Sequence, residues 1–469
     1  MPPDRRTKIV ATIGPASNDE ETLAALVDAG MDGVRLNFSH GTHDEHEVSA
    51  RRVRAVQAEA GRPLALIADL QGPKIRIGDL VAPASLVAGE SIVIAGADAC
   101  GIGDLPVAPD VLASVLEAGD EILIDDGHVR LRVERIEGVR ALCQVITGGV
   151  VEPHKGVNVP GVPLPVPSLT AKDLADLEFA LGLGVDYVAQ SFVRTHDDVA
   201  ALKSRIEAAG SQAWVIAKIE LKEAVTQLDA ILDVTDAVMI ARGDLGVEIG
   251  AAEVPLLQKR IIIEALDRGK PAITATQMLE TMIHRPEPTR AEASDVANAI
   301  LDGTSALMLS AETAVGEYPV DAVATMTQIA RAVEPSLGYR HQLPSALEEP
   351  TVGRAMSNAA CDLAEALGAK AILVPTFTGR TASAVARLRP RRPVVALTHV
   401  AASLQHMAIE WGVTPLEIPE VTDVEELWNL SISAARDAGV VNVGDRVVLT
   451  AGTAVNIPGS TNVIKVDVA

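Results

Sequence analysis

Eight short apolar runs, separated by helical stretches, constrain the fold of this chain more than any other feature. Each run is rich in Val, Ile or Leu, which is typical of parallel strands that are buried on both faces. The runs occupy residues 9–13, 33–38, 64–69, 187–191, 214–219, 237–241, 272–276 and 306–309. Eight such β-then-α units predict a (β/α)8 TIM barrel.

The composition agrees with an α/β protein. Apolar residues make up 48% of the sequence and aromatic residues only 2%, so Ala, Val, Ile and Leu must build the cores. The 63 acidic and 40 basic residues give a net charge of −23. This charge argues against nucleic acid or an anionic membrane as a partner, and an anionic substrate must therefore be met by local positive charge.

The pattern changes twice along the chain, which predicts two further domains. The interval between the third and fourth runs is far longer than a crossover needs, and its Gly-punctuated, alternating segments predict a small antiparallel β-domain. A second break lies near residues 334–350, after which strands are expected at 371–375, 393–397 and 446–450 in a C-terminal open-sheet α/β domain. We expect the barrel over 1–78 and 163–335, the inserted domain over 79–162 and the C-terminal domain over 336–469.

The cysteines and the hydropathy pattern indicate the compartment. Cys100, Cys143 and Cys361 lie far apart without metal-ligand spacing, as expected for reduced thiols in the cytosol. The first residues have no apolar signal-peptide core, and no later run of 18 apolar residues follows. We therefore expect a soluble, cytoplasmic protein.

Polar side chains follow the predicted strands at the barrel end where TIM-barrel sites form. Glu220 and Asp244 follow adjacent strands and could supply carboxylate oxygens to Mg²⁺ or Mn²⁺. Lys218 lies two residues before Glu220, so both side chains face the same way, and an ammonium group beside a metal suits a phosphoryl group in transfer. The alternative is that the three residues form only an ion-pair network at the barrel mouth.

Five motifs resemble signatures of the pyruvate kinase family. They are Thr-Lys-Ile-Val-Ala-Thr-Ile-Gly-Pro at 7–15, Arg-Leu-Asn-Phe-Ser-His-Gly at 35–41, Ala-Arg-Gly-Asp-Leu-Gly at 241–246, Ala-Thr-Gln-Met-Leu-Glu at 275–280 and Pro-Thr-Arg-Ala-Glu-Ala-Ser-Asp-Val-Ala-Asn-Ala at 288–299. Their order and the domain inserted after the third strand also match. The resemblance implies a glycolytic phosphotransferase that converts phosphoenolpyruvate and ADP into pyruvate and ATP.

The resemblance also implies roles for residues at the barrel mouth. Glu220 and Asp244 would hold the divalent ion, while Lys218 would stabilise the transferring phosphoryl group. Arg35 would clamp the phosphates, for which its planar fork is suited. The backbone at Gly243 and Asp244 would receive the substrate carboxylate, because glycine allows close approach.

Two further groups of residues follow from the resemblance. Thr276, Ser310 and Glu312 would lie near the substrate carbon that takes a proton after phosphoryl transfer. The nucleotide would lie between the barrel and the inserted domain, against Asn37, Phe38, Ser39, His40 and Lys155. The inserted domain would then act as a lid that excludes water.

One motif departs from the family pattern. Family members that need potassium hold it at positions that match Asn37, Ser39, Asp69 and the carbonyl of Leu70, within a Thr-x-Gly-Pro-Glu string. Here that string is Leu-Gln-Gly-Pro-Lys, and it ends at Lys74. A lysine in place of glutamate puts an ammonium group where the monovalent cation normally acts. We therefore expect that potassium is not required, unless Lys74 points to solvent.

Two other motifs have competing interpretations. His40, His43 and His46 lack the order of a zinc motif, so surface histidines are the better interpretation. The loop at 376–381 resembles the family's effector loop for a sugar phosphate, and a nucleotide is another candidate; its residues are Thr376, Thr378, Gly379, Arg380 and Thr381. The alternative is a tight strand-to-helix turn. The family's habit suggests a homotetramer.

Two rival functions remain open at this stage. A barrel lyase or aldolase could use Glu220 and Asp244 to hold Mg²⁺ and a keto-acid enolate, although it would not need a cradle for nucleotide phosphates. A phosphosugar sensor that has lost catalysis could use the 376–381 loop, although the retained Lys218 and Thr276 argue against it.

Overall fold

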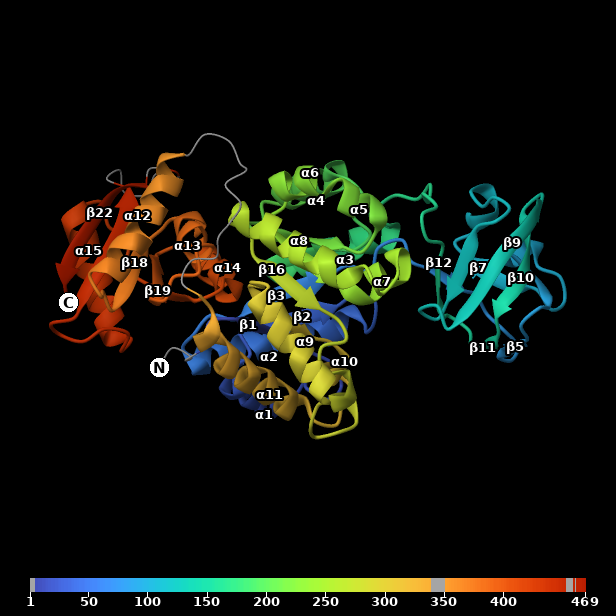
Figure 1. Ribbon diagram of the computed structural model, residues 1–469, viewed down its shortest axis with the longest axis horizontal. Coiled ribbons are helices and arrows are strands. Elements are labelled where there is room, and N and C mark those ends of the chain that lie inside the picture. Colours follow the sequence, from blue (N-terminus) through green and yellow to red (C-terminus); the bar gives the residue numbers. More distant parts are fainter. Residues whose placement is uncertain (1–4, 339–350, 453–458, 460) are drawn as a thin grey trace.

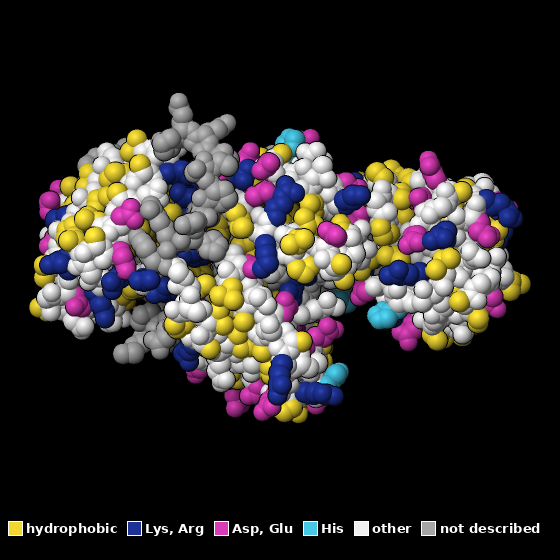
Figure 2. Space-filling model, in the orientation of Figure 1, with side chains coloured by type: hydrophobic (Ala, Val, Ile, Leu, Met, Phe, Trp, Pro, Cys, Tyr) yellow, Lys and Arg dark blue, Asp and Glu magenta, His cyan; other side chains and the backbone are white. Residues whose placement is uncertain are grey.

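Three bodies lie in a row along the molecule (Figure 1). The computed structural model describes residues 5–338, 351–452, 459 and 461–469. The C-terminal sheet lies at one end, a large barrel in the middle and a small barrel at the other end (Figure 1). In the space-filling view the large and small barrels meet at a waist, and the surface is hollowed below it (Figure 2).

The central body is a closed barrel of eight parallel strands, as the apolar runs predict. The strands are β1 (Lys8–Thr12), β2 (Gly33–Asn37), β3 (Ala65–Asp69), β13 (Tyr187–Gln190), β14 (Trp214–Ile219), β15 (Ala237–Ala241), β16 (Ala272–Ala275) and β17 (Ala306–Leu309). β1 pairs with both β2 and β17, which closes the barrel. The predicted TIM-barrel class is confirmed.

Helices cover the outside of the barrel (Figure 1). They are α1 (Glu20–Ala29), α2 (His43–Ala60), α3 (Ala171–Gly182), α4 (His196–Ala208), α5 (Lys222–Thr226), α6 (Leu228–Val234), α7 (Arg242–Ile249), α8 (Val254–Asp267), α9 (Arg290–Leu301), α10 (Ala311–Ala314) and α11 (Pro319–Val333). The predicted cap of α3 is present: the Thr170 hydroxyl accepts from the Asp173 N–H, and the Asp173 carboxylate accepts from the Thr170 N–H at 2.8 Å. Such a reciprocal cap satisfies two N–H groups that the helix leaves unpaired.

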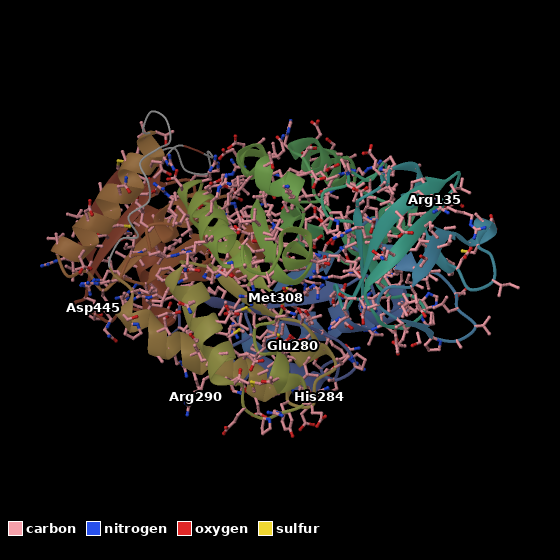
Figure 3. The ribbon with its side chains drawn as sticks, turned by 45° about the vertical axis from the view of Figure 1, so that its right-hand side comes forward. Arg135, Glu280, His284, Arg290, Met308 and Asp445 are labelled. Carbon is pink, nitrogen blue, oxygen red and sulfur yellow. The ribbon has the colours of Figure 1, made fainter. Side chains whose placement is uncertain are left out.

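Alternation along the strands produces two apolar layers. Leu66 and Val188 pack toward the helices, whereas Ile67, Tyr187 and Met308 fill the barrel interior. Figure 3 shows Met308 in the central body, far from Arg135 on the small barrel. Because strand side chains alternate with a period of two, residues two positions beyond the interior layer open into the barrel mouth. This register decides which polar residues can meet there.

The inserted segment forms a second closed barrel. Its strands are β4 (Ile75–Ile77), β6 (Ser91–Gly96), β7 (Leu105–Ala108), β8 (Glu121–Ile124), β9 (Val129–Glu137), β10 (Arg140–Thr147) and β12 (Gly156–Asn158), beside the pair β5 (Ala84–Leu86) and β11 (Gly149–Val151). Two details differ from the prediction: β6 and β7 pair in parallel, and β4 precedes the expected boundary at residue 79. β4 belongs here because Ile75 and Arg76 pair with β12.

The C-terminal body is a five-stranded sheet in the order β20 (Val413–Glu417), β19 (Val394–Thr398), β18 (Ala371–Pro375), β21 (Arg446–Gly452) and β22 (Thr461–Val468). Only β22 among these runs antiparallel to its neighbour. The helices are α12 (Val352–Ala366), α13 (Arg380–Ala386), α14 (Ala401–His406) and α15 (Val424–Asp437). The predicted break at 334–350 falls largely outside the described residues.

The C-terminal body attaches to the barrel end opposite the mouth. The Tyr187 hydroxyl donates to the His406 carbonyl at 2.6 Å, and the His406 ring stacks on Trp214 at 4.2 Å. Arg389 donates to the Gly303 carbonyl at 2.6 Å and lies over the Trp411 ring. In the described ranges, no helix has the length and apolar character to span a membrane.

Candidate active site

A buried lysine lies at the centre of the barrel mouth. The Lys218 Nζ donates to the Ser191 hydroxyl at 2.6 Å, and lies 2.8 Å from a Glu220 oxygen and 3.2 Å from an Asp69 oxygen. Burial alone would lower the pKa of Lys218, but the two carboxylates outweigh it and raise that pKa above its ordinary value. Lys218 is therefore a fixed positive charge at the mouth.

Asp69 links this lysine to Arg35. The Arg35 Nε donates to Asp69 at 2.6 Å, and its Nη1 donates to the Thr12 hydroxyl at 3.2 Å. Burial would raise the pKa of Asp69, but Lys218 and Arg35 hold it below its ordinary value. One buried carboxylate thus orients two cations toward the same space.

Glu220 and Asp244 form the acidic side of the mouth. Glu220 is 2% exposed and accepts from the Phe192 N–H at 3.0 Å, whereas Asp244 lies in the first turn of α7 and is partly open to solvent. Burial and the negative charge of Asp244 raise the pKa of Glu220, against the opposing effect of Lys218. The two carboxylates therefore interact.

These two carboxylates fit a divalent cation of the Mg²⁺ type. Among residues 5–338, 351–452, 459 and 461–469, no group of three or more His, Cys, Asp or Glu side chains could hold a metal alone. Mg²⁺ does not need such a group, because it commonly binds one or two carboxylates and completes its shell with water and substrate oxygens. A positive charge here would also relieve the repulsion between Glu220 and Asp244.

Lys74 lies in the site, not in solvent. Its side chain is 26% exposed, and its Nζ is 3.6 Å from an Asp244 oxygen. A Cβ added at Gly156 on β12 would lie 3.1 Å from the Lys74 Cε, so glycine leaves room for this lysine. The alternative interpretation of Lys74 as a solvated side chain is therefore wrong for this structure.

Oxygens at the predicted monovalent-cation position already accept hydrogen bonds. The Leu70 carbonyl accepts from the Ser191 hydroxyl at 2.7 Å, and the Asn37 Oδ1 accepts from the Ser39 N–H at 3.2 Å. Both Asp69 oxygens face cations, as described above. The structure brings all four predicted residues together, and the side-chain oxygens of Asp69, the Asn37 Oδ1 and the Leu70 carbonyl already have partners within the chain.

Positive charge also gathers beside the predicted nucleotide loop. Burial lowers the pKa of His40, and the charges of Arg76, Arg35 and Lys74 lower it further. Lys155 faces Asp125 at 3.1 Å on the small barrel. Arg76, Arg35 and Lys74 thus place local positive charge around His40, although the chain as a whole is acidic.

The ring of Phe38, a predicted nucleotide-binding residue, is buried within the protein. It is 2% exposed and stacks on His46 at 4.3 Å, while its carbonyl accepts from Lys172 at 2.7 Å. His46 in turn contacts the His40 carbonyl at 3.0 Å. These contacts fix the backbone of the loop. Phe38 could therefore contact a ligand only through its backbone, not through its ring.

The opposite wall of the mouth carries hydroxyl groups. The Thr276 hydroxyl accepts from the Gly243 N–H at 2.8 Å and donates to the Ala275 carbonyl at 2.6 Å. The buried Ser310 hydroxyl has no hydrogen-bond partner in the part of the chain that the structure describes. A Cβ at Gly243 would meet Thr276 at an ordinary 3.6 Å, so the protein itself leaves room for a side chain there.

The Glu312 carboxylate joins two backbone segments of this wall by hydrogen bonds. One carboxylate oxygen accepts from the Leu279 N–H at 3.2 Å and the other from the Ser310 N–H at 2.7 Å. The carboxylate is 3% exposed, so both oxygens are engaged by backbone. The structure gives Glu312 a role in placing Ser310 and the segment that follows Thr276.

Sequence reasoning missed two residues of the mouth, Thr12 and Ser191. Thr12 contacts Arg35, and Ser191 joins Lys218 to the Leu70 carbonyl. Both lie two positions beyond an interior residue of their strand, Val10 and Ala189. The period-two rule that selected Lys218 and Glu220 could therefore have found them.

The histidine cluster is engaged in packing. The His43 ring stacks on Phe179 at 4.1 Å, and its Nε2 lies 2.8 Å from Asp176. His46 is held against Phe38 and His40 as described above. His46 is 8% exposed, so the prediction of surface histidines is wrong for this residue.

The predicted effector loop borders a cavity of about 620 Å³ in the C-terminal body. Thr376, Thr378, Arg380 and Thr381 line it, with His399 and Arg354 on other walls. The Thr376 hydroxyl accepts from the Gly379 N–H at 3.1 Å, and Gly379 has a φ of 83°, which favours glycine. The loop is thus both a tight turn and the wall of a cavity.

Comparison with known proteins identifies the family. Residues 4–323 match the model "Pyruvate kinase, barrel domain", and residues 354–467 match "Pyruvate kinase, alpha/beta domain". The chain is 45% identical over 481 residues to "Pyruvate kinase 2" of Synechocystis sp., which covers 100% of this chain and 80% of that protein. It is 44% identical to "Pyruvate kinase" of Geobacillus stearothermophilus (99% of this chain, 80% of the relative) and of Mycobacterium intracellulare (98% of each chain). The chain therefore belongs to the pyruvate kinase family.

Proposed function

We infer that this protein transfers the phosphoryl group of phosphoenolpyruvate to ADP and yields pyruvate and ATP. The observation that carries this inference is the Lys218 ammonium, buried between Asp69 and Glu220 at the barrel mouth. It lies beside a pair of interacting carboxylates that suits a divalent ion. Family membership supports the same reaction.

The residues of the mouth favour a displacement at phosphorus. The bond between phosphorus and the enol oxygen breaks as a β-phosphate oxygen of ADP bonds to phosphorus. Lys218 and Arg35 would face the transferring group, where charge spreads over its oxygens. Asp69 holds both cations in place before the substrate arrives, so little reorganisation is needed. When bound by Glu220 and Asp244, Mg²⁺ or Mn²⁺ supplies further charge neutralisation.

A proton must then reach the enolate carbon to give pyruvate. Thr276 and Ser310 are the hydroxyl groups proposed near that carbon, with Glu312 placing Ser310 through its backbone. The N–H groups of Gly243 and Asp244 in the first turn of α7 would receive the substrate carboxylate. The Gly243 N–H now donates to Thr276, so substrate would share or replace this bond.

The inserted domain is proposed as a lid over the nucleotide. ADP would lie between the backbone of Asn37 to His40 on the barrel and Lys155 on the small barrel. Lys155 has acidic neighbours, Asp125 and Glu152, which it would exchange for phosphate oxygens. Closure of the domain at 79–162 would exclude water, so that ADP accepts the phosphoryl group.

A coupled assay tests the function. Purified protein with phosphoenolpyruvate, ADP and Mg²⁺ is expected to form pyruvate, measured by NADH oxidation through lactate dehydrogenase. Omission of ADP or addition of excess chelator should abolish product, because both the acceptor and the divalent ion are needed. Pyruvate formed from phosphoenolpyruvate without ADP would contradict the inference, because water would then be the phosphoryl acceptor and phosphate the second product. Ligand binding without turnover would favour a sensor.

The cavity beside Thr376 to Thr381 is proposed as a regulatory anion site. Hydroxyl groups and the Arg380 guanidinium line it, a combination that suits a phosphorylated sugar or nucleotide. Arg380→Ala is expected to weaken activation by glucose 6-phosphate, ribose 5-phosphate or AMP about tenfold, measured as the activating concentration at low phosphoenolpyruvate. The control variant is Arg436→Ala, at an exposed arginine on α15, and it should leave activation unchanged. Activation unchanged in Arg380→Ala, or absent with all three compounds in wild type, would contradict the proposal.

Two further properties are proposed from the family resemblance and the mouth. The protein is expected to assemble as a homotetramer, which light scattering would measure. Potassium is not expected to be required, because Lys74 brings a positive charge to the site and because the Leu70 carbonyl and the Asn37 Oδ1 already accept hydrogen bonds.

A further inference from the structure

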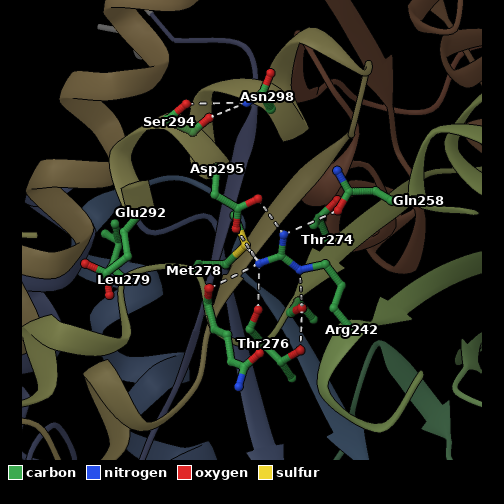
Figure 4. A network of polar contacts seen from close by, with 12 residues as sticks. Arg242, Gln258, Thr274, Thr276, Met278, Leu279, Glu292, Ser294, Asp295 and Asn298 are labelled. Carbon is green, nitrogen blue, oxygen red and sulfur yellow. Dashed lines mark hydrogen bonds and ion pairs between the residues drawn. The ribbon is translucent and has the colours of Figure 1, made fainter. Parts of the chain in front are cut away.

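A single arginine side chain holds the turn that presents Thr276. Arg242 begins α7, and its guanidinium donates to three successive carbonyls: Ala275 at 3.3 Å, Thr276 at 2.8 Å and Gln277 at 3.2 Å (Figure 4). The Arg242 side chain is 10% exposed. Its contacts therefore lie where water competes little.

The turn it holds has an unfavourable backbone. Thr276 has a φ of 66° and Gln277 a φ of 53°, so two consecutive non-glycine residues lie in the left-handed region. A non-glycine residue in this region is strained and persists only where its surroundings enforce it. The turn directs the three carbonyls toward Arg242, while the Thr276 hydroxyl meets the Gly243 N–H. Arg242 is thus a main support of the conformation that places this hydroxyl.

Asp295 on α9 fixes the guanidinium in turn. One of its oxygens lies 2.8 Å from Nη1 of Arg242 and the other 2.7 Å from Nη2, a two-point pairing (Figure 4). Gln258 and the Met278 sulfur complete the surroundings at 3.4 Å and 2.7 Å. The pairing sets the plane of the guanidinium, which then matches the three carbonyls.

We propose that Arg242 and Asp295 are positioning residues for proton delivery to the enolate carbon, acting through the Thr276 turn. The proposal rests on the proposed function, because it needs Thr276 near that carbon. It assigns these residues to the proton step and not to phosphoryl transfer, for which Lys218 and Arg35 are placed. Loss of the pairing should therefore harm the two steps unequally.

Hydrogen exchange of pyruvate isolates the proton step. With pyruvate, ATP and Mg²⁺ in D₂O, a methyl C–H bond breaks, its proton passes to solvent and its electron pair forms the enolate. Addition of a deuteron then gives labelled pyruvate, with no net redox change. Proton NMR follows the loss of the methyl signal. Formation of ATP in the first turnover from phosphoenolpyruvate and ADP reports phosphoryl transfer separately.

Arg242→Lys is the first variant. It keeps a positive charge beside Asp295, but one ammonium group cannot reproduce the fork that bonds three carbonyls. Exchange is expected to fall about 10²-fold, the loss that follows from a misplacement of about 1 Å. First-turnover ATP formation and the KM for ADP are expected to change less than about fivefold. Asp295→Asn, which keeps the guanidinium, is expected to lower exchange about tenfold.

Arg268→Lys is the matched control. The Arg268 side chain is 12% exposed and pairs with Asp229 and Asp233, but it follows α8 at the barrel end opposite the mouth. The rate of pyruvate hydrogen exchange in Arg268→Lys should stay within about twofold of wild type. Thermal unfolding of all variants shows whether they fold.

Failure of the positioning role and failure of the proposed function give different results. Exchange within about threefold of wild type in a folded Arg242→Lys would overturn the positioning role, as would an equal loss of exchange and first-turnover ATP. If Arg242→Lys does not fold, Asp295→Asn decides in the same way. If wild type forms no pyruvate from phosphoenolpyruvate and ADP, the proposed function fails instead.

Discussion

Replacement of Lys218 by methionine is expected to lower pyruvate formation about 10³-fold or more. Methionine keeps much of the side-chain length but removes the ammonium group that faces the transferring phosphoryl. Loss of one preorganised donor costs about 10²–10³ in turnover, and loss of a phosphoryl-stabilising cation costs about 10³–10⁵. Steady-state kinetics with saturating phosphoenolpyruvate, ADP and Mg²⁺ measure the effect.

A matched variant separates chemistry from folding. Removal of Lys218 also leaves Asp69 and Glu220 without a cation that both contact, which destabilises the site. Lys8 is another buried lysine of the barrel, at the end opposite the mouth, where it donates to the Val413 carbonyl at 2.9 Å. Lys8→Met should keep turnover within about threefold per folded molecule. A folded Lys218→Met that retained a tenth of wild-type activity would contradict the assigned role.

The barrel could be predicted because its strands leave a strong signal. A parallel strand buried on both faces needs a continuous apolar run, and the runs at 214–219 and 237–241 coincide with β14 and β15. The residues at their ends, Lys218, Glu220 and Asp244, follow from the rule that barrel sites form at the carboxyl ends of strands. Local sequence was therefore sufficient for the acidic pair and its lysine.

Other features depend on contacts that no local pattern contains. β20 and β22 lie at the edges of the C-terminal sheet, and β22 alternates in burial, so neither has a long apolar run. Phe38 is adjacent to the nucleotide loop in sequence, but its ring turns inward because His46 on α2 stacks on it. The role of Arg242 depends on Asp295, which is 53 residues away along the chain. Such partners become visible only when the helices are placed.

Wild-type protein is expected to be active without potassium. At constant ionic strength, replacement of tetramethylammonium by potassium should change wild-type turnover less than about twofold, because the site already holds its own cation. The Lys74 Nζ lies 3.6 Å from Asp244, and the Leu70 carbonyl and Asn37 amide oxygen already accept hydrogen bonds. Stimulation of wild type by tenfold or more would contradict the expectation.

The converse substitution gives the sharper test. Lys74→Glu would put a third carboxylate beside Asp244 and Glu220. Burial and the negative charge of Asp244 already raise the pKa of Glu220. Without potassium the turnover of Lys74→Glu should fall about 10²-fold, since like charges destabilise the site and weaken the hold on the phosphoryl group. Added potassium should raise the turnover of Lys74→Glu at least tenfold, because a monovalent cation supplies the charge that the lysine carried. Lys74→Met is the control, because it removes the positive charge without adding a negative one. Its turnover without potassium should fall less than that of Lys74→Glu. If potassium restored neither variant, the ammonium group of Lys74 would not be acting in place of the cation.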